Sequence, residues 1–415
     1  MIHYKQIETM SVSGEESEPL SRVLLFDSDG LSNYTCYLAR GISKFRQVVL
    51  YSFSKKSHIV TGASLEKNVK FQYIKKWLPK GYSTLKGIIR VILLFFILLM
   101  TLTRNKYEIV HIQQHLPMFF FFIPLLKMRH KKIFWTLHDT EIYIPSSNIH
   151  GKLQVLFLEI VSQPKIMMRW CDGIIVHAVS LKKQLIEKKV DQNKIHVIPH
   201  FDYNYLLENN FTNFSNSVDI PNTSSDQNNL PKEYALFFGN IAPWKGMEVL
   251  IEASSVVTDK LGEKFNLVIA GTPYDGYHSY FNDLVREGSG CIKLINRFIE
   301  SYEIPVFIKN SSFLILPYAE SFQYSVSGVI PLAYTFSKPV VVSSIEPLKE
   351  YVENGRTGLI FKCGDSRQLA NCIIELVQNY SKCSEMGMNA HEKMLREMSL
   401  AQCCEVLNTL YNKKE

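Results

Sequence analysis

The chain has 415 residues, enough for two domains that each bury a core of their own. Hydrophobic residues make up 46% and charged residues 20% of the chain, a composition that excludes an intrinsically disordered protein. A net charge of +7 is too modest to indicate a nucleic-acid-binding protein, and we expect no nucleic-acid partner. The eight cysteines show no CxxC pair and no metal-ligand spacing, which favours a reduced, cytoplasmic setting.

The first half of the chain is predicted to be one doubly wound domain. Residues 1–20 are polar and acidic, resemble no signal peptide and are expected to form a flexible tail. Over residues 21–207, short apolar runs alternate with stretches of helical spacing, the pattern of a parallel sheet covered by helices. Its predicted strands are Val23–Phe26, Val48–Phe53, Ile109–Ile112, Ile133–Leu137, Gly173–His177 and Ile195–Ile198.

A second doubly wound domain is predicted at residues 233–398. The preceding residues 208–232 are rich in asparagine and poor in aliphatics, which is typical of a linker. Alternation then resumes, and the chain ends in a helix at about 399–415. The predicted strands are Ala235–Phe238, Asn266–Ala270, Cys291–Ile295, Phe313–Leu316, Val340–Ser343 and Gly358–Phe361.

Two apolar runs in the first domain adjoin clusters of basic residues. Val91–Met100 is too short to span a membrane, which takes roughly 20 apolar residues. Apolar segments beside basic clusters suit the surface of an anionic membrane, and we expect peripheral contact; the alternative is two helices that cover the sheet. Lys75, Lys76, Lys80, Lys86 and Arg90 precede this run, and Lys127, Arg129, His130, Lys131 and Lys132 follow the second, Met118–Leu126.

The segment Phe237–Gly246 reads as a buried strand, a glycine turn and a proline-started helix with Lys245 in its first turn. The start of a helix offers unpaired N–H groups and a positive dipole end, which suit a phosphate. On these residues alone, an ordinary turn with a solvated lysine is equally compatible. A second strand, ending near Pro317, leads through a small-residue loop to a helix start at Ser327, Gly328 and Val329. Two such loops on one domain suit a ligand that carries a diphosphate.

With these segments the chain resembles the family 4 glycosyltransferases of the GT-B fold, from about Val23 to the C-terminal helix. The resembling segments are Phe26–Thr35, Thr136–Asp139, Lys194–His200, Phe237–Gly246 and Glu350–Leu359. The resemblance implies an α/β protein whose two Rossmann-like domains face a cleft, with the C-terminal helix crossing back to the first domain. It also implies a retaining glycosyltransferase that uses a nucleotide-diphosphate sugar and no metal or other cofactor.

The resemblance assigns roles to particular residues. His138 approaches the transferred sugar, and Gly30 and Ser32 face the acceptor. Lys245 is the best candidate cation for the leaving diphosphate, and the backbone N–H groups of Ser327, Gly328 and Val329 are the best donors to it. The expected partners are a nucleotide sugar, a lipid-linked or glycan acceptor and an anionic membrane surface, at the inner face of the membrane.

Two positions depart from the family pattern. Asn240 replaces the usual arginine five residues before Lys245, and Arg356 or Arg297 is a candidate to compensate. The usual glutamate pair is incomplete: Glu320 is placed for the first, whereas Leu332 stands where the second would be. We therefore also considered a non-catalytic partner subunit of GT-B shape and a sugar-nucleotide epimerase as alternatives.

Overall fold

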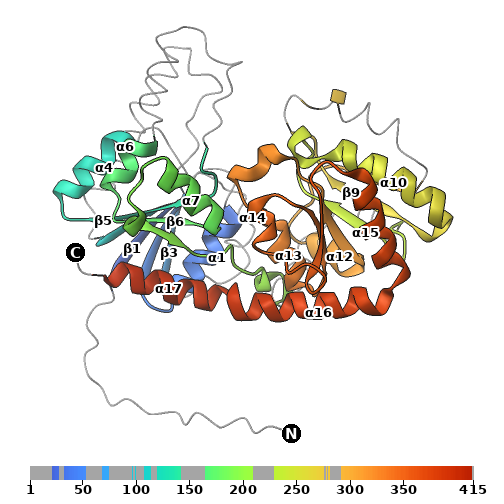
Figure 1. Cartoon of the computed structure of the whole chain (residues 1–415). Coiled ribbons are helices and arrows are strands. Elements are labelled where there is room, and N and C mark those ends of the chain that lie inside the picture. Colours follow the sequence, from blue (N-terminus) through green and yellow to red (C-terminus); the bar gives the residue numbers. More distant parts are fainter. Residues whose placement is uncertain are drawn as a thin grey trace, which may run out of the picture.

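The computed structural model describes residues 21–27, 32–52, 68–73, 96, 99, 107–113, 119–141, 164–208, 229–274, 277, 279–280 and 291–413. These residues form two parallel sheets that lie side by side, each covered by helices (Figure 1). In this part of the chain, no helix combines the length and the apolar character needed to cross a membrane. Most of the predicted linker 208–232 lies outside the described residues.

The first sheet has seven parallel strands in the order β3-β2-β1-β4-β5-β6-β7. Its strands are β1 Arg22–Asp27, β2 Gln47–Ser52, β3 Val69–Tyr73, β4 Ile109–Ile112, β5 Lys132–Leu137, β6 Gly173–Val176 and β7 Ile195–Val197. Helices α1 Ser32–Ile42, α4 Phe119–Met128, α6 Pro164–Trp170 and α7 Val179–Glu187 belong to this half. Six of the strands were predicted, whereas the edge strand β3 was not.

The second sheet has six strands in the order β10-β9-β8-β11-β12-β13, so it repeats the winding of the first. Its strands are β8 Ala235–Phe238, β9 Leu267–Gly271, β10 Ile292–Asn296, β11 Phe313–Leu316, β12 Val340–Ser343 and β13 Gly358–Phe361. Its helices are α10 Met247–Leu261, α12 Ile304–Asn310, α13 Val329–Thr335, α14 Glu346–Lys349 and α15 Ser366–Gln378. In such sheets the strand order reverses at a switch point, here between β1 and β4 and between β8 and β11, and ligands bind beyond the strand ends there.

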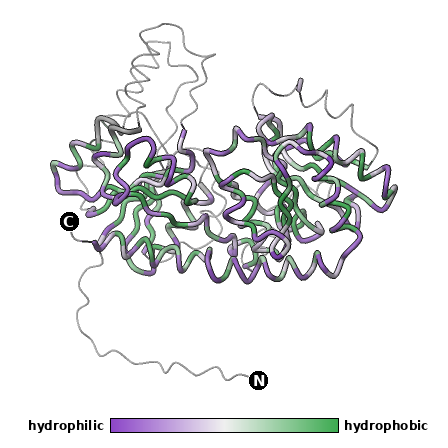
Figure 2. The backbone as a smooth tube through the Cα atoms, viewed as in Figure 1, coloured by the Kyte–Doolittle hydropathy of each residue, from purple (hydrophilic) through white to green (hydrophobic). Residues whose placement is uncertain are grey.

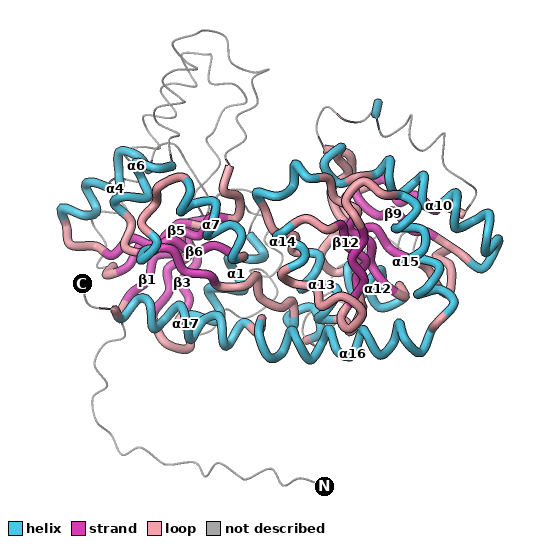
Figure 3. The backbone as a smooth tube through the Cα atoms, in the orientation of Figure 1, coloured by secondary structure: helices cyan, strands magenta, loops and turns pink. Residues whose placement is uncertain are grey.

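The hydrophobic core of each half lies around its sheet. Strands β4, β6, β9, β11 and β12 are buried at every position, as expected for parallel strands covered on both faces. The backbone colouring shows the same pattern, with apolar strands inside and mixed helices outside (Figures 2 and 3). The site must therefore be built from the loops at the strand ends.

The C-terminal helices connect the two halves. Helices α16 Tyr380–Glu397 and α17 Leu400–Asn412 run along one edge from the second sheet to the first (Figure 1). Near the end of α17, the Tyr411 ring packs at 4.8 Å from the ring of Phe134, and its hydroxyl lies 2.5 Å from Nδ1 of His111. The Leu400 N–H, at the start of α17, donates to the Asp202 carboxylate at 2.7 Å. The predicted return of the C-terminal helix to the first domain is confirmed.

Candidate functional site

Lys245 lies at the switch point of the second sheet, where the chain leaves β8. The 3₁₀ turn η4 Pro243–Lys245 ends at Gly246, whose φ of 68° is left-handed, and α10 begins only at Met247. Pro243 begins the element that carries Lys245, as predicted, but this element is a 3₁₀ turn that Gly246 separates from α10. A Cβ at Gly246 would lie 1.9 Å from the Pro317 carbonyl oxygen, so only glycine permits this close approach of β11.

The Lys245 ammonium group rests against two aromatic rings. Its Nζ lies 3.7 Å from the centre of the Tyr318 ring and 4.3 Å from that of Phe322, within the range of cation–π attraction. Both rings follow β11, and Phe322 belongs to the 3₁₀ turn η6 Glu320–Tyr324. The Ala319 N–H donates to the Trp244 carbonyl at 3.0 Å and ties this turn to η4. Glu320, the first residue of η6, is exposed.

The predicted diphosphate loop precedes α13. The buried Ser327 hydroxyl lies 3.1 Å from the Tyr318 hydroxyl, and the Val329 N–H donates to Ser327 Oγ at 3.3 Å. Of the three predicted donors, the Val329 N–H thus already has a partner in the chain. A Cβ at Gly328 would lie 2.7 Å from Oη of Tyr203, so this glycine lets the loop contact the first half.

The candidates for the family's missing arginine are already paired. Asn240 is exposed on the loop after β8. The Arg297 guanidinium binds both carboxylate oxygens of Glu303, each at 2.7 Å. Arg356 pairs with Glu353 at 3.0 Å. Each guanidinium group therefore binds a glutamate in this structure.

His138 directly follows β5, as predicted, and its loop contacts the second half. Asp139 forms an isolated antiparallel bridge with Ser325, and the Thr140 N–H donates to the Tyr324 carbonyl at 2.9 Å. Desolvation raises the pKa of Asp139, and Ser325 and Lys245 offset only part of this rise. These contacts hold the loop after His138 against η6 and the loop before α13.

The acceptor-side predictions are described only in part. Gly30 lies outside the described residues, and Ser32 begins α1. Gln113, which follows β4 at the first switch point, is fully buried. Neither its Nε2 nor its Oε1 has a hydrogen-bond partner in the described part of the chain. A buried, unpartnered amide is costly, which makes Gln113 an additional candidate contact for a polar ligand.

From the sequence, His177 was only a weaker candidate, and its pairing with His138 was not predicted. His177 follows β6, the strand beside β5, and its Nε2 lies 3.3 Å from Nδ1 of His138. Its Nδ1 lies 2.9 Å from the Ile198 carbonyl oxygen, which can only accept, so Nδ1 of His177 carries the proton. The signal was present, because adjacent parallel strands end at the same edge of a sheet.

The protonation state of His138 follows from this chain of contacts. Burial lowers the pKa of His177 to about 4, so its ring is neutral and its Nε2 accepts. His138 must then donate from Nδ1, which leaves Nε2 as an acceptor. Burial, together with His177 and His200, also lowers the pKa of His138. Among the described residues, Nε2 of His138 has no hydrogen-bond partner, so it can accept a hydrogen bond from a hydroxyl group.

Glu350 and Tyr351, from the segment that follows the donor loop, connect the two halves. The Tyr351 hydroxyl accepts from the His200 N–H at 2.9 Å and donates to the His177 carbonyl at 2.7 Å. The Glu350 carboxylate accepts from the N–H groups of Val179, at 2.5 Å, and Ser180, at 2.7 Å, and so caps α7. Through these contacts, the second half holds the strand that carries His177.

Within the described residues, no three His, Cys, Asp or Glu side chains are grouped so as to hold a metal ion. The site thus combines neutral imidazoles and a buried amide from the first half with a lysine, a turn and a small-residue loop from the second. Such a site can bind a ligand that has an anionic part and a hydroxyl-bearing part.

Comparison with protein families gives two matches, one for each half. Residues 28–201 match the family described as Glycosyltransferase Family 4, and residues 232–379 match Glycosyl transferases group 1. An uncharacterized glycosyltransferase of Methanocaldococcus jannaschii is 28% identical over 43% of this chain, a stretch that covers only 47% of that relative. The capsular polysaccharide biosynthesis glycosyltransferase CapM of Staphylococcus aureus is 23% identical over 60% of this chain and 63% of its own length.

Solved structures share the fold over nearly the whole chain. HepE of Anabaena, solved in complex with UDP, superposes with a TM-score of 0.66 and 15% identity, over 95% of this chain and all of its own. Sucrose-phosphate synthase from Thermosynechococcus elongatus superposes with a TM-score of 0.68 and 13% identity, over 94% of this chain and 98% of its own. These likenesses confirm the predicted GT-B fold.

Proposed function

Because the chain belongs to the glycosyltransferases of group 1 and family 4, we propose that it moves a sugar from a nucleotide-diphosphate sugar to a lipid-linked or polysaccharide acceptor in cell-surface glycan synthesis. Two comparisons support this setting. CapM acts in capsular polysaccharide biosynthesis, and a relative that is 21% identical over 72% of this chain comes from the cps region of Klebsiella pneumoniae. HepE has been solved with UDP-glucose, which supports a nucleotide sugar as donor.

The observation that carries the proposal is the contact of the loop after His138 with the segment between β11 and α13, whose aromatic rings hold Lys245. The bridge between Asp139 and Ser325 brings the end of β5 to the loop before α13. A donor whose diphosphate lies at Lys245 would then present its sugar toward Nε2 of His138. We assign Lys245 and the N–H groups of Ser327 and Gly328 to the charge that develops on the leaving diphosphate, a role that needs no metal.

His138 has a binding role in this proposal. Its neutral, unprotonated Nε2 accepts a hydrogen bond from a hydroxyl of the transferred sugar, while Glu320 borders the donor from η6. We propose that the reaction retains the anomeric configuration, with the acceptor hydroxyl attacking on the face that the diphosphate leaves. The acceptor enters from the side of the first half, where Gly30, Ser32 and Gln113 follow their strands. Contact with the inner face of the membrane would bring a lipid-linked acceptor to the first half.

The test compares wild type with His138→Ala and with His391→Ala, a matched change on α16 away from the site. Purified proteins are incubated with a panel of nucleotide sugars, and release of nucleoside diphosphate is measured. We expect His138→Ala to lower the rate about 10- to 100-fold, because one hydrogen bond to a hydroxyl is lost. Calorimetry with the free nucleoside diphosphate should give equal affinities for all three proteins, since Lys245 and its loop are intact.

A marked loss of nucleotide affinity in His138→Ala would contradict this division of roles. If wild type bound a nucleotide sugar without ever turning it over, the non-catalytic partner subunit would be the better reading. Conversion of the sugar without release of nucleoside diphosphate would instead favour an epimerase.

A further inference from the structure

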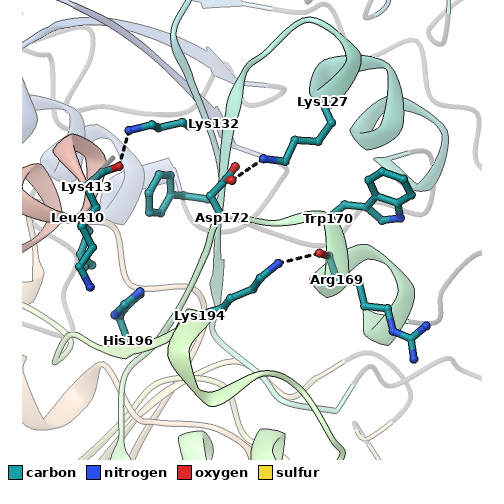
Figure 4. Close-up of a pocket in the computed structure, with 10 residues that line it drawn as sticks. Lys127, Lys132, Arg169, Trp170, Asp172, Lys194, His196, Leu410 and Lys413 are labelled. Atoms are coloured by element: carbon teal, nitrogen blue, oxygen red, sulfur yellow. Dashed lines mark hydrogen bonds and ion pairs between the residues drawn. The ribbon is translucent and has the colours of Figure 1, made fainter. Parts of the chain in front are cut away.

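A pocket of about 380 Å³ opens at the edge of the first sheet opposite the candidate site (Figure 4). Lys132, which begins β5, is part of its lining, whereas His138 follows the other end of the same strand. The pocket therefore cannot belong to the glycosyl-transfer site. Its volume falls within the range of roughly 300–1,000 Å³ that small-molecule sites occupy.

The lining of this pocket is strongly basic. Five cations from separate segments line it together with one carboxylate, that of Asp172, which pairs with Lys127. Burial, with the charges of Lys413 and Lys182, lowers the pKa of His196, so its ring adds no positive charge. The lining therefore carries a net positive charge, which would attract an anion. The five cations are Lys127, Lys132, Arg169, Lys194 and Lys413.

Two of these lysines are held in place by neutral partners. The Lys132 ammonium donates to the carbonyl of Tyr411 at 2.9 Å and to that of Lys413 at 2.7 Å. The Lys194 ammonium donates to the Arg169 carbonyl at 2.8 Å (Figure 4). Carbonyl groups orient these side chains without neutralising their charge. Each ammonium carries three N–H donors, so both have donors left for an incoming anion.

One exposed apolar side chain lines the pocket, and two more lie on the helix that carries Lys127. Trp170, which lines it, is 46% exposed at the end of α6. On α4, the helix that ends beside Lys127, Met128 is 77% exposed and Leu125 is 38% exposed. Large apolar groups next to a basic pocket match the boundary between the headgroups and the chains of an anionic bilayer, where aromatic rings also concentrate.

We propose that this pocket binds the phosphate group of an anionic phospholipid, while Trp170, Met128 and Leu125 contact the lipid surface. The inference rests on the membrane contact proposed above and gives it a defined site. Binding at this pocket would fix the orientation of the protein on the bilayer. The opposite end of β5, where the glycosyl-transfer site lies, would point away from the membrane. An acceptor would then reach His138 around the side of the first half.

The test measures binding to vesicles of phosphatidylcholine with and without phosphatidylglycerol. The pocket variant is the double substitution Lys194→Gln with Lys413→Gln. Its control, Lys260→Gln with Lys264→Gln, removes the same charge from exposed positions in the second half. We expect the pocket variant to bind the phosphatidylglycerol vesicles about thirtyfold more weakly, from about fivefold per basic residue, and the control to bind like wild type. Equal midpoints of thermal unfolding would show that all three proteins are folded.

Wild-type binding that both double variants weaken equally would overturn the pocket and leave only a diffuse attraction to the membrane. If the pocket variant bound the vesicles as tightly as wild type, the pocket would not be the lipid site, although the membrane contact itself would remain supported. Calorimetry with glycerol 3-phosphate separates the two sources of phosphate. Pocket-dependent binding of this soluble compound, with no binding to vesicles, would keep the phosphate site but overturn the lipid as its ligand.

Discussion

Acid should destabilise the first half steeply, because its buried histidines are neutral. Burial lowers the pKa of His111 to about 3, of His177 to about 4 and of His200 to about 3. The pKa of an unfolded histidine is about 6.5. As pH falls below that value, the unfolded chain takes up protons that the folded chain cannot bind. The free energy of unfolding therefore falls from about pH 6.5 down to the folded pKa values.

The size of the effect follows from the number of protons. One proton bound by the unfolded state alone changes the free energy of unfolding by about 1.4 kcal/mol per pH unit, so three give about 4 kcal/mol per unit. At about pH 5 the accumulated loss approaches 6 kcal/mol, on the order of the whole stability of a typical domain, 5–15 kcal/mol. The first half should thus unfold in mild acid.

Urea unfolding at several pH values tests this prediction. The unfolding is monitored by the fluorescence of Trp135, which is buried in the same sheet. His111→Gln should lower the slope by one proton, about 1.4 kcal/mol per pH unit. His111 Nε2 lies 2.8 Å from Oγ1 of Thr136, so Thr136→Val disturbs the same contact and keeps the imidazole. It should reduce stability at every pH without changing the slope. The reasoning would be refuted if the free energy of unfolding of the wild type changed with pH by less than one proton's worth, about 1.4 kcal/mol per pH unit. It would also be refuted if His111→Gln left this pH dependence unchanged.

Three further changes test the site and its support. Lys245→Met should lower turnover about 100-fold or more. The control Lys309→Met removes a lysine that lies 6.0 Å from the ring of Phe336 and should leave turnover unchanged. Comparable losses of turnover in the two variants would argue against a diphosphate role for Lys245. Tyr351→Phe should lower the free energy of unfolding by about 2–4 kcal/mol, because the buried His200 N–H and His177 carbonyl lose their partner. An unshifted midpoint of urea unfolding would show that these hydrogen bonds do not stabilise the protein. Gly246→Ala should cost about 3–5 kcal/mol through its clash with a carbonyl. Gly262→Ala, also at a positive φ but without neighbours within 4 Å, should cost only about 1–2 kcal/mol in chemical denaturation, and equal costs would remove the packing argument.

The strands were predictable because parallel strands buried on both faces are continuous apolar runs. The exception, β3, alternates Val69, Phe71 and Tyr73 with polar residues, as an edge strand does, and is only five residues long. The local form of the Lys245 turn was less predictable. A glycine after Lys245 is compatible with a continuing helix, and no local pattern shows that the Pro317 carbonyl approaches it or that its φ is left-handed.

The donor-side loops were located from sequence, but the supports of the site were not. The segment around Glu350 resembles a family signature, and its pattern gives no sign that the carboxylate caps α7, about 170 residues earlier in the chain. The pairing of His138 with His177 likewise depends on the order of the strands in the sheet. Such contacts join residues far apart in sequence, and no local pattern encodes them.

The return of α17 to the first sheet has a consequence for synthesis of the chain. Domains generally fold as units while they are made, the N-terminal one first. Here Tyr411, near the very end of the chain, covers Phe134 and His111 of the first sheet. The first sheet therefore cannot complete its core until α17 has emerged from the ribosome. The second sheet lies entirely within residues 235–361, so its strands are available earlier than the helix that completes the first.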